Sequence, residues 1–179
     1  MKNYIYVDNS NIFIEGQRVS AVARGMARNI FEASRQEIVD RDWNIDYGKL
    51  YSIVCGNPQE IGAARLWGSP PPKDTFWGMV KSYGFDVTTY EKGAGGGEKK
   101  VDVAIAHRMT KDAYTLIDKG SSGLVLVSGD KDFVPVVEDL TSEGFVVVVA
   151  FWSHAASELK SVASDFFDLN QYHKDLAWS

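Results

Sequence analysis

The fold is decided by the stretch Leu124-Val125-Leu126-Val127-Ser128-Gly129-Asp130-Lys131-Asp132-Phe133. Its four consecutive aliphatic residues, closed by Ser-Gly, predict a strand that is buried on both faces, as strands of parallel sheets are. Two aspartates, Asp130 and Asp132, follow that strand. Because open α/β sheets bind ligands in the crevice at the carboxyl ends of their strands, this loop is where an acidic site is expected.

The remaining chain alternates between strand-like and helix-like segments. Apolar, β-branched and aromatic runs predict further strands at 4–7, 63–67, 85–90, 145–151 and 166–169. Helices are predicted at about 13–34 (one or two), at 46–54 after the cap Asp46, from 73 or 74 to 84, and at 101–118, 133–143 and 155–163. The glycine-rich residues 92–100 form either a flexible connection or a lid that contacts substrate. This order predicts an α/β fold, a three-layer α/β/α sandwich with a mainly parallel central sheet.

Length and composition narrow the class of protein. A chain of 179 residues, 45% hydrophobic and 24% charged, is expected to form one globular domain over residues 1–179. Its longest apolar run, residues 145–152, is far shorter than the roughly 20 residues of a membrane span. The first residues enter a strand without a signal core, so a cytoplasmic location and no membrane contact are expected. With one cysteine and three scattered histidines, a zinc or disulfide site is not expected.

The net charge of −5 argues against a surface coated for nucleic acid, because phosphate binding is driven by lysine and arginine. Four aspartates gathered around cations would leave only −1 on the rest of the chain. Basic residues can therefore still cluster beside an acidic site.

Asp8 follows the first strand directly, as Asp130 follows the strand at 124–127. If these two strands flank the switch point of a doubly wound sheet, their carboxylates face each other across the crevice. Asp102 is the third candidate, because it heads the apolar stripe of the next helix. That stripe comprises Ile105, Ala106, Met109, Ala113 and Leu116. The alternative for Asp102 is a first-turn carboxylate that only complements the helix dipole.

Asp132 fits two roles equally well. It can be the N-cap of the helix that carries Pro135 in its first turn, or it can contact a metal ion, and one residue can serve both.

Several carboxylates in one crevice repel each other, and a divalent cation resolves the conflict. Mg²⁺ or Mn²⁺ suits oxygen ligands and substrate phosphates, so the predicted chemistry is phosphoryl transfer with a metal-activated water. Asn11 and Ser128 can orient waters or phosphate oxygens, although both are common turn residues. Lys100 can meet a scissile phosphate or be solvated. Trp67 and Trp77 can stack on bases, but core packing is their more frequent use.

Four stretches together resemble the NYN domain, in particular the LabA-like (DUF88) branch of the PIN-like nuclease superfamily. They are Tyr4–Asn11, Lys100–Val103, Val127–Phe133 and Ser164–Phe167. The resemblance covers the chain from Tyr4 to about Leu169. It implies a PIN-like fold and metal-dependent cleavage of RNA, expected to be single-stranded, with an acidic cluster at Asp8, Asp102, Asp130 and Asp132 and with Asn11 in support. Asp165 matches a recurrent family position without a stated role.

Two features depart from the family pattern. Asn9 stands where the family often has glycine, and the segment from Gly16 to Asn44 is long. This segment is expected either to cover the cleft or to mediate association, for example into a homodimer. Some family members are regulators, so a non-catalytic RNA-binding or protein-interaction module that keeps the fold and the metal site is the main alternative.

Two other α/β classes fit less well. A von Willebrand A-type adhesion module needs a second serine after Ser10 and leaves Asp102 unexplained. A haloacid dehalogenase-type phosphatase needs an aspartate two residues after Asp8, where Ser10 stands.

Overall fold

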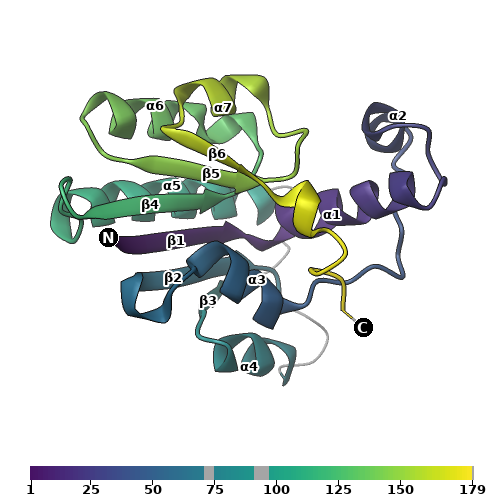
Figure 1. Ribbon diagram of the computed structural model, residues 1–179, viewed down its shortest axis with the longest axis horizontal. Coiled ribbons are helices and arrows are strands. Elements are labelled where there is room, and N and C mark those ends of the chain that lie inside the picture. Colours follow the sequence, from purple (N-terminus) through teal and green to yellow (C-terminus); the bar gives the residue numbers. More distant parts are fainter. Residues whose placement is uncertain (71–74, 91–96, 179) are drawn as a thin grey trace.

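The computed structural model describes residues 1–70, 75–90 and 97–178, and these form three layers of secondary structure (Figure 1). Within them, six strands make one sheet in the order β3-β2-β1-β4-β5-β6, and every neighbouring pair is parallel. The strands are β1 (Lys2–Asp8), β2 (Ile61–Gly68), β3 (Asp86–Thr89), β4 (Ser122–Val127), β5 (Val147–Phe151) and β6 (Asp165–Asp168). The predicted α/β/α sandwich with a parallel sheet is confirmed.

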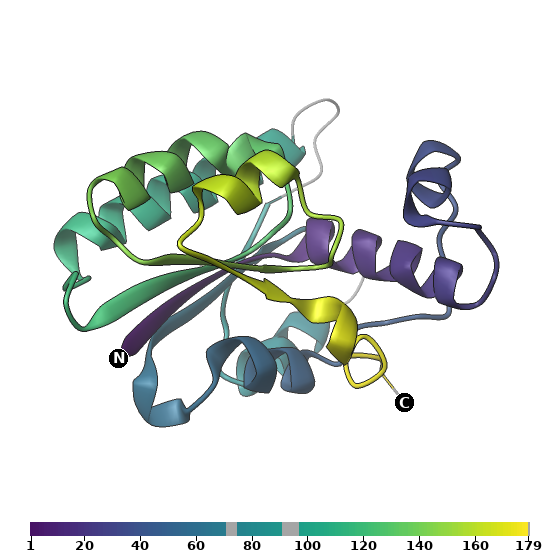
Figure 2. The same cartoon turned by 45° about the horizontal axis from the view of Figure 1, so that its top comes forward.

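Helices cover both faces of the sheet (Figure 2). One face carries α5 (Gly97–Thr115), α6 (Val134–Ser142) and α7 (Ser157–Val162), and the other carries α3 (Tyr47–Cys55) and α4 (Thr75–Ser82). The first helix, α1 (Asn9–Ala23), instead projects beyond the carboxyl edge of the sheet and meets α2 (Ile30–Arg35) at its far end. In the described part of the chain, no helix is long and apolar enough to cross a membrane.

The central strands explain why the chain adopts this order. Ile5 and Val7 of β1 and Leu124 and Leu126 of β4 are fully buried, because helices cover both sides of the strands that carry them. The chain passes from β1 to β2 on one side and later returns to β4 on the other side of β1. The strand order therefore reverses between β1 and β4, and the predicted switch point lies at their carboxyl ends.

Several helix ends differ from the sequence prediction. The side chain of Asp8 accepts a hydrogen bond from the backbone N–H of Asn11 and starts α1 at Asn9, not near residue 13. The helix predicted at 101–118 is α5, which begins at Gly97 and ends at Thr115. Leu116 lies beyond its last turn and is half exposed, so its predicted place in the buried stripe is wrong. The predicted start of α4 at 73 or 74 and residues 91–96 lie outside the described residues.

Short 3₁₀ helices complete the connections and are η1 (Pro58–Glu60), η2 (Lys131–Phe133) and η3 (Leu169–Tyr172). Of these, η2 positions the candidate site, because it stands between β4 and α6.

The projecting helix α1 is fastened at Gly16. A Cβ atom on this residue would lie 2.5 Å from the ring of Trp43 and 2.8 Å from that of Trp152, so only glycine fits. His173, near the C-terminus, stacks on Trp43, and its Nε2 lies 3.3 Å from the carbonyl oxygen of Gly16. The long segment noted in the sequence thus packs against residues from the other end of the chain.

Candidate metal centre

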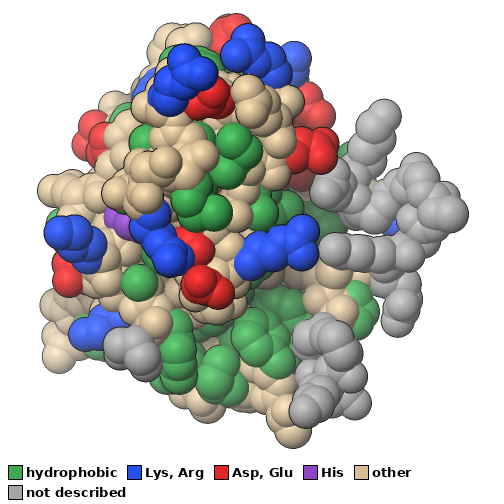
Figure 3. Space-filling view, turned by 90° about the vertical axis from the view of Figure 1, so that its right-hand side faces the viewer, with side chains coloured by type: hydrophobic (Ala, Val, Ile, Leu, Met, Phe, Trp, Pro, Cys, Tyr) green, Lys and Arg blue, Asp and Glu red, His purple; other side chains and the backbone are tan. Residues whose placement is uncertain are grey.

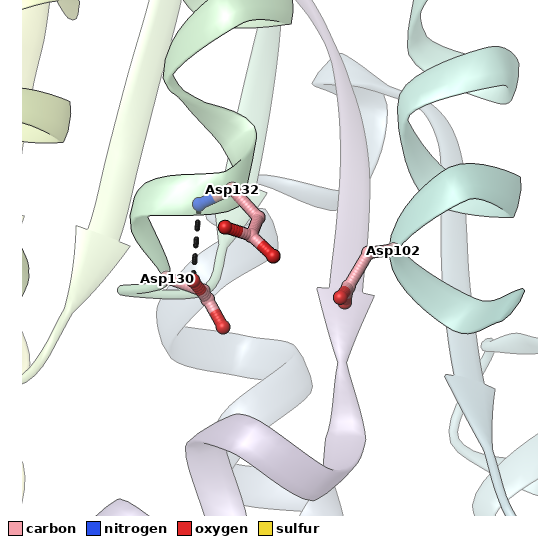
Figure 4. A group of neighbouring side chains, drawn as sticks. All are labelled: Asp102, Asp130 and Asp132. Atoms are coloured by element: carbon pink, nitrogen blue, oxygen red, sulfur yellow. Dashed lines mark hydrogen bonds between the residues drawn. The ribbon is translucent and has the colours of Figure 1, made fainter. Parts of the chain in front are cut away.

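Three aspartates come together at the carboxyl edge of the sheet (Figure 4). One carboxylate oxygen from each of Asp102, Asp130 and Asp132 lies within 4.8 Å of the other two. Asp102 projects from the first part of α5, whereas Asp130 and Asp132 lie in the turn that follows β4. The sequence placed Asp102 on one element and Asp130 and Asp132 after another, and the fold brings all three to one point.

The turn after β4 is held by Asp130. This residue is the N-cap of η2, and its Oδ1 accepts a hydrogen bond of 3.0 Å from the backbone N–H of Asp132. At the start of α6 the cap position is Phe133, without a side-chain bond. The interpretation of Asp132 as a helix N-cap is therefore wrong, because the 3₁₀ turn moves the start of the helix past it.

Asp8 lies at the end of β1 and is buried, with 5% of its surface exposed. Its Oδ1 accepts a 3.2 Å bond from the Asn11 N–H, and its Oδ2 lies 3.5 Å from the Ser128 hydroxyl. Burial, with a smaller contribution from the charges of Asp102 and Asp130, raises the pKa of this carboxyl to about 7, although the hydrogen bonds from Asn11 and Ser128 oppose the shift. Without a cation nearby, Asp8 is therefore partly protonated at neutral pH.

Asn11 and Ser128 join the ends of β1 and β4. Asn11 Oδ1 accepts bonds from the Gly129 N–H at 2.9 Å and from the Ser128 hydroxyl at 3.0 Å. Ser128 is fully buried, and a Cβ atom on Gly129 would lie 2.2 Å from the ring of Phe151. These contacts fix the backbone from which Asp130 projects, so both polar residues hold the loop in place.

The remaining predicted residues lie at different distances from this centre. Lys100 is exposed on α5, two residues before Asp102. Asp165 begins β6 and pairs with Val148, level with the middle of the sheet, so it stands away from the acidic cluster. Trp67 and Trp77 are buried in the core, as their more frequent use predicts.

The family model of the NYN domain matches residues 4–170. The chain belongs to the NYN domain family. NYN domains are part of the PIN-like nuclease superfamily, whose nucleases use divalent metal ions. A search of curated proteins finds no match to this chain.

Among solved structures, the NYN domain described here is similar to a protein of unknown function from Vibrio parahaemolyticus. The two share 18% sequence identity with a TM-score of 0.69, over 99% of this chain and 96% of the other. At this identity the likeness shows the fold alone.

The donor set of the NYN domain suits a hard divalent cation. Asp102, Asp130 and Asp132 offer carboxylate oxygens, the ligands that Mg²⁺ and Mn²⁺ prefer, and no thiolate or imidazole stands among the three. Burial is the main cause of the raised pKa of Asp8, and repulsion by the charges of Asp102 and Asp130 adds to it. A bound cation would offset this repulsion, so the residues present fit a metal ion.

The sequence did not reveal a second polar group on α1. Glu15 Oε2 lies 2.7 Å from His154 Nε2, and Glu15 also pairs with Arg18. Glu15 follows Asn11 by four residues and so shares its helix face, which is the signal that could have found it. His154 belongs to the loop after β5, so no local pattern in the sequence links it to α1.

Two hollows flank the first turns of α5. One lies between α5 and the β2–β3 edge of the sheet and the other between α5 and the start of α6, and Val103 lines both. Asp102 and Asp132 line the second. On the face that looks onto the carboxyl edge, acidic and basic side chains lie next to one another with hydrophobic side chains exposed between them (Figure 3).

Proposed function

We propose that this NYN domain is a metal-dependent endoribonuclease of the LabA-like (DUF88) branch that hydrolyses phosphodiester bonds in single-stranded RNA. Its catalytic and metal-binding residues are Asp8, Asp102, Asp130 and Asp132. The observation that carries the proposal is the convergence of three carboxylates within 4.8 Å, beside a fourth whose pKa is raised by burial and by its neighbours.

The proposed cofactor is Mg²⁺ or Mn²⁺, which Asp102, Asp130 and Asp132 would hold together with Asp8. When bound, such an ion supplies Lewis acidity, which lowers the pKa of a water for attack on phosphorus and offsets charge on the phosphate oxygens. In return, the positive charge lowers the pKa of Asp8 and leaves its carboxylate ionised. No nucleophilic side chain is required.

The other proposed residues position this group. Asn11 and Ser128 hold the Gly129 backbone, and so set the direction in which Asp130 points. Lys100, exposed near Asp102, is placed to meet the negative charge of a phosphate. Each of these residues acts through hydrogen bonds or charge.

The test is a time course of cleavage of a mixed-sequence RNA with Mg²⁺, with Mn²⁺ and with EDTA. Wild type is compared with Asp130→Asn, which removes one ligand charge and keeps the side-chain shape. We expect cleavage by the wild type only with metal, and a loss of at least about 100-fold in Asp130→Asn, since even residues outside the ligand shell cost 10–100-fold. The circular dichroism spectra of the two proteins should coincide.

Asp139→Asn is the matched control, because Asp139 is an exposed aspartate on α6 and does not belong to the group of three. It should cleave like the wild type. Equal background cleavage by wild type and Asp130→Asn would reject the enzyme and favour a non-catalytic RNA-binding or regulatory module.

The setting of this activity is also proposed. Residues 1–179 act as one domain in the cytoplasm, where RNA substrates are found. The projecting α1–α2 segment is the surface through which we propose that a homodimer forms, because it carries Phe31, whose surface is 79% exposed.

A further inference from the structure

The groove between α5 and the β2–β3 edge of the sheet, called here the α5–β3 groove, is not explained by the acidic centre. Its volume is about 710 Å³. Because successive residues of a strand point to opposite faces, Arg65 and Trp67 of β2 and Thr88 of β3 all face this side. Among the described helices of this face, α6 and α7 lie over the other half of the sheet, and α5 forms one wall of the groove (Figure 2).

Basic side chains line the helical wall of the groove. Lys100, His107, Arg108 and Lys111 all face it, at the spacing i, i+7, i+8 and i+11 that gives one side of a helix. This stripe starts two residues from Asp102 and extends about 16 Å, at 1.5 Å of rise per residue. A row of positive charge therefore leads away from the acidic centre.

The charge of the groove is opposite to that of the whole chain. Its lining contains four Lys or Arg side chains and a single aspartate, Asp86, whereas the chain has a net charge of −5. Among the described residues, no carboxylate forms an ion pair with Lys100 or Lys111. The field of the groove thus favours an anion.

A buried carboxylate fixes two of the cations. Asp112, 1% exposed, lies 2.6 Å from Arg65 Nη1 and 2.9 Å from Arg108 Nε, and it accepts a bond from the hydroxyl of Tyr6. Two guanidinium groups have ten N–H donors, far more than one carboxylate can accept, so donors remain for a ligand. Because Asp112 holds both guanidinium groups beside the groove, the arginines lie there before anything binds.

Between the charges, the groove offers apolar surface. Val103 is 68% exposed at its edge, and Tyr90 is half-buried at the end that follows β3. Proteins that bind single strands combine a basic track for the phosphates with apolar and aromatic surface for the unpaired bases. In duplex RNA the base faces are hidden, so it would leave this surface unused.

We propose that the α5–β3 groove binds the stretch of a single RNA strand next to the scissile phosphate, with Arg65, Arg108 and Lys111 contacting its phosphates. This inference rests on the proposed function, since it assigns the path of that enzyme's substrate. It adds a binding surface that lies outside the acidic centre.

The test measures binding separately from cleavage. A fluorescently labelled 12-nucleotide single-stranded RNA is titrated with full-length protein in EDTA at several salt concentrations. Lys111→Glu is expected to weaken binding about tenfold at low salt and to reduce the slope of log affinity against log salt by about 1. Lys111 is exposed, so its replacement leaves the core intact.

The matched control is Lys49→Glu, which makes the same change of charge at an exposed lysine of α3, on the opposite face of the sheet. It should bind RNA within about twofold of the wild type, because only distant, screened charge is altered. The proposed binding role of the groove would be overturned by any of three results. These are an equal loss of RNA affinity in both variants, unchanged RNA affinity in Lys111→Glu, or no binding of RNA by the wild type.

Cleavage assays on the same proteins separate the two proposals. If the wild type cleaves RNA and Lys111→Glu binds and cleaves it equally well, the nuclease activity is supported and the role of the groove in RNA binding is rejected. If the wild type does not cleave but Lys111→Glu alone loses RNA affinity, the groove stands and the nuclease is rejected.

Discussion

The floor and the rim of the acidic centre are built in different ways. Asp8, at the floor, is buried and tied by hydrogen bonds to Asn11 and Ser128. Asp130 and Asp132, at the rim, are more exposed and belong to a short turn. Charge at the floor is costly because it is shielded from water, whereas charge at the rim is solvated.

This difference shows which aspartates of the centre lower the stability of the folded protein. At the floor, the buried Asp8 lowers the free energy of unfolding, because a carboxyl with a raised pKa destabilises the folded state once it ionises. The carboxylates of the rim add negative charge with little loss of stability, because water solvates them. Replacing a floor residue and a rim residue should therefore have different effects on activity and on stability.

The largest effect is expected at the floor. Asp8→Asn should reduce RNA cleavage by at least about 100-fold, because it removes the charge closest to the buried end of the site. The protein should nevertheless stay folded, since the amide oxygen can still accept the Asn11 N–H. Initial cleavage rates in Mg²⁺ and urea unfolding on the same samples measure both. Full activity in Asp8→Asn would remove the distinction between floor and rim.

The second effect is a pH dependence of stability. The pKa of Asp8 rises on folding from 3.8 to about 7, so the folded state holds a proton that the unfolded state releases. As pH increases from about 4 to about 7, the wild type should lose stability relative to Asp8→Asn, with a plateau above pH 7. The expected difference is on the order of 4 kcal/mol, because each unit of pKa shift corresponds to about 1.4 kcal/mol.

Urea unfolding in EDTA at several pH values measures this difference. Asp139→Asn serves as control and should stay within about 0.5 kcal/mol of the wild type throughout, as surface substitutions do. A constant gap between wild type and Asp8→Asn across the pH range would contradict the assignment. Adding Mg²⁺ above pH 7 should stabilise the wild type, because the ion binds only the folded state.

The smallest effect is expected at Asp132, the most exposed aspartate of the rim. Asp132→Asn should lower cleavage about tenfold and change the free energy of unfolding by less than about 0.5 kcal/mol, because the side chain is exposed and caps no helix. Cleavage rates over a range of Mg²⁺ concentrations should show a raised metal requirement. A large loss of stability in this variant would show that the rim, like the floor, is structural.

The fold was predictable because its strands are short apolar runs separated by helices with clear stops. The 124–127 run and the 4–7 run read as buried strands, and both are central in the sheet. The direction of α1 was not predictable, because helical periodicity says which face is apolar and not whether the helix folds back on the sheet. That direction depends on the packing of Gly16 against Trp43 and Trp152.

The acidic residues were predictable for a related reason. Asp8 and Asp130 each follow a central strand, so the parallel sheet alone brings their ends together. The role of Asp132 was predicted wrongly in part, because the sequence does not show that a 3₁₀ turn precedes α6. The α5–β3 groove was not predicted, because Arg65 and Asp112 are 47 residues apart and meet only through tertiary packing.

The strand order also governs how the protein is made. Of the six strands, β1 is synthesised before the others, but one of its two partners, β4, begins only at Ser122. The acidic cluster draws its members from residues 8, 102, 130 and 132, so it cannot assemble until synthesis has passed the loop after β4. A chain synthesised only as far as the end of α5 therefore carries Asp8 and Asp102 but lacks Asp130 and Asp132.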